Sequence, residues 1–412
     1  MTRTSPLTAH RQAMLAWLGL AAALLVLAGC GPKPRAAGGA LDTPEHHTLR
    51  GHDMIDAGDW AGARREFDLA LSLDAKHSQA LAGKSIVAAK DSTAQGLSAD
   101  KREDGYENAE DLYKRALSEA KTPADTRAGH VAAIRAHTIT KMPEGWLEEA
   151  RDHYDDAIDT EGAAQDPAPD FYRARAERES FLLVEAGTYY QRVLAMNRGK
   201  TKEADAELAV VQKVIRAQPG SRYGKIVAFL EKVNRADMAA LFIGELQLAR
   251  LYTRGNSNVD NSFRAPEQGD FQTEEVVRAP EATDIAEHPL RTDIDEVMKL
   301  RVVGLEPDPA HRFNPDKEVT RAEFALMVED ILVKVTGETN VRTKFIGQAS
   351  PFPDVRNDLP YFNAVQTVVS RNLMEPKDKV RGMFAPREPV TGAEALLVIR
   401  LLRDELASFL RS

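Results

Sequence analysis

The 412-residue chain has a single cysteine, Cys30, and aromatic residues make up only 6% of it. One cysteine excludes an intramolecular disulfide, so the folded part depends on its hydrophobic core. The formal net charge of -9 argues against nucleic-acid binding, which requires a basic surface. Walker, Gly-x-Ser-x-Gly and His-Glu-x-x-His motifs are absent. Metal-ligand spacing is lacking in histidines such as His46, His47, His77 and His130. We therefore predict no enzyme activity, no cofactor and no metal site.

The chain begins with a basic segment that leads into a short apolar run. Arg3 and Arg11 precede the apolar residues 13–27, and small residues lead into Cys30. This order predicts an export signal, since the apolar run is short for a membrane span. Leu-Ala-Gly-Cys resembles the lipobox of bacterial lipoproteins, which implies cleavage before Cys30 and lipid on its thiol. An ordinary signal peptide with an incidental cysteine is the alternative.

The resemblance to lipoproteins assigns the N-terminal segments. We expect residues 1–29 to be the signal peptide and residues 30–42, rich in Pro, Gly and Ala, to be a flexible linker next to the lipid. Cys30 is then the lipid attachment site, and the chain is anchored in the cell envelope. Gly31 after the cysteine favours the outer membrane, facing the periplasm, if the host is Gram-negative.

Residues 43–220 have helical periodicity and an internal repeat. An Ala-aromatic-Ala pattern at i, i+4 and i+7 occurs in residues 63–70, 109–116 and 150–157, with a weaker copy in residues 204–211. Small residues let two helices approach while the larger one fills the groove between them. With Gly51, Trp60 and residues 71–80, the first copy is similar to a tetratricopeptide repeat, which implies a concave face for a protein partner. A generic helical bundle is the alternative.

A second pattern recurs in the C-terminal half. Residues 313–327 contain Phe-Asn-Pro and then Val-Thr-Arg-Ala-Glu, and residues 384–397 repeat this as Phe-Ala-Pro and Val-Thr-Gly-Ala-Glu. An earlier copy survives in its helical part, residues 233–241. The helix caps are Asn234, Thr320 and Thr391, each three residues before an acidic residue. Because a cation in the first turn opposes the helix dipole, Arg235 and Arg321 indicate an anionic partner, either an internal carboxylate or one on a ligand.

Asp284 and Asp354 each stand in an Asp-Ile or Asp-Val turn that precedes a helix and one of these boxes. Residues 221–406 therefore resemble three S-layer homology motifs, the first of them partial, with a loop at about residues 256–281. The resemblance implies a pseudo-threefold helical domain that binds cell-wall polysaccharide or peptidoglycan. The glycan-binding residues that it implies are Arg235, Asp237, Asp284, Arg321, Glu323, Asp354 and Glu394. The third motif departs from the pattern with Gly392 in place of the arginine.

Together these patterns predict an all-α protein with a tetratricopeptide-like solenoid followed by an S-layer-homology-like domain. The leading hypothesis is a non-enzymatic envelope lipoprotein that tethers or scaffolds between membrane and wall polymer. The alternative is an assembly or secretion accessory lipoprotein whose repeats bind a protein and whose C-terminal module is only structural. We considered an envelope hydrolase as well, but paired carboxylates such as Asp155 and Asp156 are typical of a solvated helix face.

Overall fold

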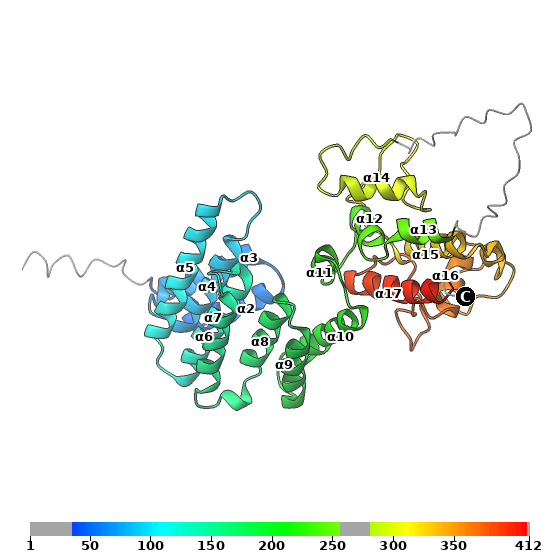
Figure 1. Ribbon diagram of the computed structural model, residues 1–412. Coiled ribbons are helices and arrows are strands. Elements are labelled where there is room, and N and C mark those ends of the chain that lie inside the picture. The colour runs from blue at the N-terminus through cyan, green and yellow to red at the C-terminus, as the bar shows by residue number, and fades with distance from the viewer. Residues whose placement is uncertain (1–34, 256–280, 410–412) are drawn as a thin grey trace, which may run out of the picture. The chain divides into compact units, whose positions relative to one another are not determined.

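The computed structural model describes residues 35–255 and 281–409. Within these ranges the chain forms helices and turns, with isolated β-bridges but no strand, which confirms the all-α prediction (Figure 1). The signal peptide, Cys30 and most of the expected loop at residues 256–281 lie outside the described residues. No helix among the described residues has the length and hydrophobicity needed to cross a membrane.

The chain divides into two compact units. The first extends to Ser180 and includes Ala195–Lys200, and the second comprises Phe181–Leu194 and the residues from Thr201 onward. The expected boundary between domains at residue 220 stays a prediction. We describe each unit by itself.

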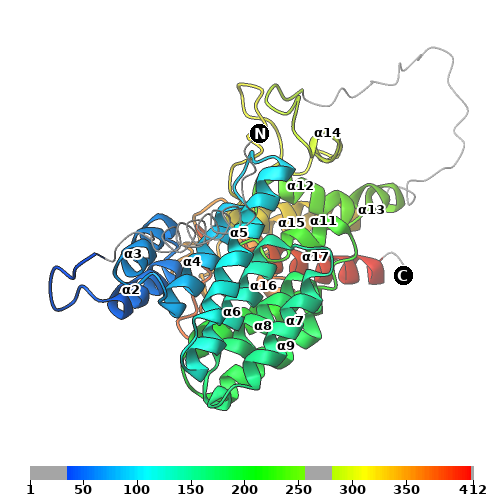
Figure 2. The ribbon, with the colours of Figure 1, turned by 90° about the vertical axis from the view of Figure 1, so that its left-hand side faces the viewer.

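The first unit is a stack of helical hairpins. Its helices are α2 (Pro44–Asp56), α3 (Trp60–Leu73), α4 (Ser78–Asp91), α5 (Ala99–Ser118), α6 (Pro123–Thr140), α7 (Trp146–Ile158) and α8 (Ala168–Glu179). Consecutive helices pair as α2 with α3, α4 with α5 and α6 with α7, and α6 contacts both α4 and α8. Figure 2 shows the same stack from a second side. Pairs that contact their neighbours in sequence are the arrangement of a helical-repeat protein.

The repeated Ala-aromatic-Ala pattern forms the core of this stack. Its members are all buried: Ala63, Phe67, Ala70, Ala109, Tyr113, Ala116, Ala150, Tyr154 and Ala157. The Phe67 ring lies between two glycines of neighbouring helices. A Cβ atom added at Gly51 or Gly83 would lie 2.6 or 2.2 Å from a ring atom of Phe67. These glycines therefore let α2 and α4 pack closely against the aromatic ring.

Ahead of the first hairpin, residues 35–42 lie in the expected linker. The backbone N–H of Arg35 donates a hydrogen bond to the Ser72 carbonyl at 2.7 Å. Its guanidinium pairs with Asp42, whose carboxylate also contacts His47 Nε2 at 2.9 Å. The end of this segment is thus joined to the first repeat.

The second unit combines short and long helices, and three of them begin at equivalent positions. Its helices are α9 (Leu183–Met196), α10 (Thr201–Ala217), α11 (Arg222–Val227), α12 (Arg235–Gly244), α13 (Leu248–Gly255), α14 (Arg291–Lys299), α15 (Arg321–Thr336), α16 (Phe362–Ser370) and α17 (Gly392–Phe409). The three boxes found in the sequence open α12, α15 and α17, and α17 contacts both α12 and α15. It also packs against α10, so α10 supports the C-terminal module (Figure 1).

A closed ring of backbone hydrogen bonds joins the three boxes. Val319 donates to the carbonyl of Val233, Val390 to that of Val319, and Val233 to that of Val390, each at 2.9 Å. The three valines are at most 1% exposed. Each immediately precedes a helix cap, so the ring sets the three helices in a pseudo-threefold arrangement.

Further backbone hydrogen bonds join neighbouring boxes. They connect equivalent residues between the first and second boxes and between the second and third. Arg235 and Ala236 donate from their backbone N–H groups to Lys317 and Pro315, and Arg321 and Ala322 donate likewise to Glu388 and Pro386. At the third junction, the N–H of Gly392 donates to the Leu230 carbonyl at 2.8 Å. All three boxes therefore belong to one cyclic unit, including the partial first copy.

Candidate functional site

Asn234, Thr320 and Thr391 occupy the cap positions of the three box helices. The Asn234 side chain accepts a hydrogen bond from the Asp237 N–H at 2.7 Å, and the Asp237 carboxylate accepts one from Asn234 N–H at 3.0 Å. Thr320 and Glu323 form the same reciprocal pair. Thr391 accepts from the Glu394 N–H at 3.3 Å. Local capping thus accounts for where these helices begin.

Arg321 lies in the first turn of α15, and its side chain is 1% exposed. Its Nε donates to the Phe384 carbonyl at 2.8 Å, and its Nη2 donates to the Glu375 carbonyl at 2.6 Å. Nη1 forms an ion pair with Glu394, and the guanidinium lies over the Phe384 ring, 4.6 Å from its centroid. Burial lowers the pKa of Arg321 to about 10, so the side chain still carries its charge at neutral pH.

Arg235 makes corresponding contacts with the loop one motif earlier, with the Gly304 carbonyl as a partner where Arg321 has the Glu394 carboxylate. Its Nε donates to the Phe313 carbonyl at 2.7 Å, and its other nitrogens donate to the carbonyls of Gly304 and Glu306. The guanidinium lies 4.6 Å from the centroid of the Phe313 ring. Each arginine therefore fixes the Phe-x-Pro loop of the following motif.

Gly392 stands where the third arginine would be, and the packing explains the departure. A Cβ atom at this position would lie 1.7 Å from the carbonyl oxygen of Val227. The end of α11 thus occupies the space that an arginine side chain would need, and only glycine fits this close approach.

Asp284 and Asp354 also hold these loops, each by accepting hydrogen bonds from two backbone N–H groups. Asp284 accepts hydrogen bonds from the N–H groups of Phe313 and Asn314, both at 2.7 Å. Asp354 accepts from Phe384 at 3.0 Å and from Ala385 at 2.7 Å. Asn314 and Ala385 have φ angles of +55° and +58°, a left-handed conformation that asparagine tolerates and that costs energy in alanine. The carboxylates therefore stabilise two left-handed turns, of which the one at Ala385 is strained.

The remaining predicted glycan-binding residues also have internal partners. Asp237 accepts a hydrogen bond from the Tyr223 hydroxyl at 2.5 Å, Glu323 pairs with Lys317 at 2.7 Å, and Glu394 pairs with Arg321. The seven residues are thus spread over the junctions between motifs and are not gathered at one open site. Their contact with a glycan stays a prediction.

Arg321 and Glu394 nevertheless border an open cavity of about 730 Å³, which we call the basic groove. Its charged lining residues are Lys213, Arg216, Arg321, Glu375, Lys377, Lys379, Glu394, Arg400 and Asp404. They come from α10, α15, α17 and the segment between α16 and α17. The contribution of α10 could not be predicted from the sequence, because its cations are distant in sequence from Arg321 and Glu394 and line the same cavity only in the folded unit.

The basic groove has an excess of positive charge. Lys377, Lys379 and Arg400 pair with Glu388, Glu375 and Asp404. In the described part of the chain, neither Lys213 nor Arg216 has a carboxylate within ion-pair distance. Burial lowers the pKa of Lys213, and the like charges of Lys377, Arg216 and Arg321 lower it further. Because repulsion between cations is relieved by a bound anion, the groove suits a negatively charged ligand.

A comparison with known families identifies part of this unit. The family model for the S-layer homology domain matches residues 351–396, which include Asp354, Phe384, Thr391 and Glu394. The predicted S-layer homology motif is therefore confirmed for this range, and it indicates association with the cell wall or envelope. No curated protein and no solved structure matches the chain.

The first unit has a basic cavity of its own, of about 410 Å³, which we call the Tyr172 pocket. Its lining includes Trp60, Lys90, Arg135, Lys141, Tyr172, Arg175, Arg178 and Glu179. The guanidinium of Arg135 lies 4.3 Å from the centroid of the Tyr172 ring. Lys141 and Arg178 pair with Glu179, the only carboxylate in the lining. The pocket is therefore cationic and aromatic.

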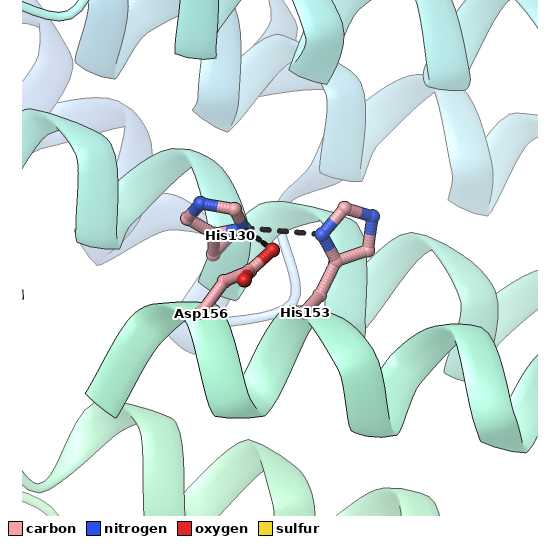
Figure 3. Close-up of side chains that lie close together, drawn as sticks. All are labelled: His130, His153 and Asp156. Atoms are coloured by element: carbon pink, nitrogen blue, oxygen red, sulfur yellow. Dashed lines mark hydrogen bonds and ion pairs between the residues drawn. The ribbon is translucent and has the colours of Figure 1, made fainter. Parts of the chain in front are cut away.

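His130, His153 and Asp156 form a third polar group, in the first unit. His130 comes from α6, and the other two come from successive turns of α7 (Figure 3). Their potential ligand atoms lie within 4.8 Å of one another. The sequence offered only the i, i+3 spacing of His153 and Asp156 as a signal, because the third member is on another helix.

Replacement of Arg321 tests the junction between the second and third motifs. We expect Arg321→Leu to destabilise the second unit by about 3–5 kcal/mol, because it leaves the carbonyls of Phe384 and Glu375 and the Glu394 carboxylate without their partner. Hydrogen exchange of the amides in α15 and α17 measures the change. Arg387→Leu, at an exposed position, is the control. Equal protection in the two variants would contradict the proposed role of Arg321.

Proposed function

We propose that this chain is a non-enzymatic envelope lipoprotein that tethers or scaffolds between a membrane and a cell-wall polymer. Lipid on Cys30 would anchor one end, and the C-terminal unit would bind the polymer. The observation that carries the proposal is the basic groove beside the matched S-layer homology domain. Glu394, within the matched residues, lines the groove together with cations of α10.

The contacts of Arg321 favour a particular mode of recognition. Glu394 already supplies the anionic partner that an arginine at this position requires. Lys213 and Arg216 are better placed to meet a ligand, because their charges are not balanced by carboxylates within the described residues. A wall polymer bearing carboxylate or phosphate groups would supply the missing negative charge.

Sedimentation with purified wall polymer tests this site without disturbing the motif junctions. We expect Lys213→Gln to weaken binding about tenfold, the effect of losing roughly one charge-assisted hydrogen bond. Lys202→Gln on the same helix α10 is the matched control, because Lys202 is exposed and does not line the groove. Chemical removal of acidic substituents from the polymer should abolish binding of the wild-type chain.

Two results would argue against this function. Equal binding by the wild-type chain and the Lys213→Gln variant would exclude the basic groove as the polymer site. No sedimentation of the wild-type chain with native polymer would leave the C-terminal unit with a structural role only.

The Tyr172 pocket favours a second function, an accessory lipoprotein that binds a protein partner through its repeats. The lining has five cations and one carboxylate, and Arg135 and Lys90 lie over the rings of Tyr172 and Trp60. Cations held against aromatic rings suit a segment with carboxylates and apolar groups. We therefore propose that the repeats bind an acidic protein segment.

A pull-down from envelope extract tests the second function. We expect the wild-type chain to recover a stoichiometric protein and Arg135→Gln to lose it, because the variant removes a lining cation that lies over the Tyr172 ring. Arg65→Gln, at an exposed position of α3, is the control. Lys213→Gln should retain the partner, which separates this function from polymer binding. Retention of the partner by Arg135→Gln would exclude the Tyr172 pocket as its site.

A further inference from the structure

We propose that His130, His153 and Asp156 form a binding site for a divalent transition metal, with Zn²⁺ as the ion that fits the ligands best. The site would join α6 to α7 within one hairpin of the first unit. It is separate from both the basic groove and the Tyr172 pocket, since none of its residues lines either cavity.

The spacing of the ligand atoms supports the site. His130 Nδ1 lies 3.1 Å from His153 Nδ1 and 3.7 Å from a carboxylate oxygen of Asp156 (Figure 3). In a tetrahedral zinc site with bonds of 2.0–2.1 Å, two ligand atoms lie about 3.3 Å apart. The two observed separations lie on either side of this value, and the ligand atoms of His153 and Asp156 lie within 4.8 Å of each other. Side-chain rotations, chiefly of the exposed Asp156, would therefore bring all three atoms to one ion.

The chemistry of the ligands favours a divalent transition metal. Two imidazole nitrogens and one carboxylate oxygen are a common set for zinc, with a fourth position left for water. Calcium and magnesium prefer oxygen ligands alone, and the site has no thiolate of the kind that copper(I) favours. The Asp156 side chain is 63% exposed, so an ion can reach the site from solvent.

The neighbouring side chains fix the orientation of His153. Its ring is stacked on that of His137, with centroids 5.7 Å apart, and meets the edge of the Tyr113 ring. His137 is itself held by the Met142 carbonyl, 2.8 Å from its Nδ1. A ligand ring that packing holds in place loses little freedom when it binds a metal. Burial also lowers the pKa of His130 and His153, which favours the neutral rings that metals bind.

A hydrogen bond between the two imidazoles would explain the 3.1 Å separation without a metal. Metal titration of the full chain in detergent, after treatment with a chelator, separates the two explanations. We expect one Zn²⁺ to bind per chain, and Co²⁺ in its place to give the intense visible absorption of a tetrahedral site. His130→Gln and His153→Gln should each weaken binding at least tenfold.

Asp156→Asn and Asp155→Asn form a matched pair, because both carboxylates are exposed on α7 and only Asp156 belongs to the site. We expect Asp156→Asn to weaken zinc binding about tenfold and Asp155→Asn to leave it unchanged. Absence of zinc binding by the wild-type chain would overturn the proposal in favour of the imidazole hydrogen bond. Binding by the two histidine variants that equals binding by the wild-type chain would also overturn it. So would a Co²⁺ spectrum of the wild-type chain without the tetrahedral bands, a result that does not depend on the folding of any variant.

Discussion

The ring of hydrogen bonds among Val233, Val319 and Val390 is the constraint on which the C-terminal unit depends. Each valine uses its N–H and its C=O within the ring, and all three are buried. An N–H group left unpaired at such a site costs about 1–3 kcal/mol. Displacing any one motif from the ring therefore destabilises the other two. Because each helix begins just beyond its valine, the ring also places the arginines and the loops that they hold.

Most of the residues that join the motifs differ from those that line the basic groove. Arg235 and Arg321 donate to loop carbonyls, and Asp284 and Asp354 accept from loop amides, so the most recognisable residues of the motif join one motif to the next. The basic groove, where we propose that a ligand binds, is lined by Arg321, Glu394 and the cations that α10 adds. The helix that precedes the motifs in sequence is therefore part of the proposed binding site.

Features set by local spacing could be predicted from the sequence. The 3.6-residue periodicity gave the helices, and the Phe-x-Pro and Thr-x-x-Glu spacing identified the S-layer homology motif, which the family comparison confirms for residues 351–396. Contacts between distant segments could not be predicted. The partners of Arg321 at Glu375 and Phe384 are more than fifty residues away, and the clash that requires Gly392 involves Val227 on another helix. The histidine cluster likewise depends on the packing of α6 against α7.

A link between membrane lipid and wall polymer is tested most directly by fractionating envelopes of cells that make the wild-type chain or Cys30→Ser. The proposed function predicts that the wild-type chain is recovered with the membrane and stays with the wall after detergent dissolves the lipid. Cys30→Ser should lose the membrane fraction and keep the wall fraction. Complete release of the wild-type chain by detergent would contradict the link. Retention of Cys30→Ser in membranes from which the wall has been removed would also contradict it.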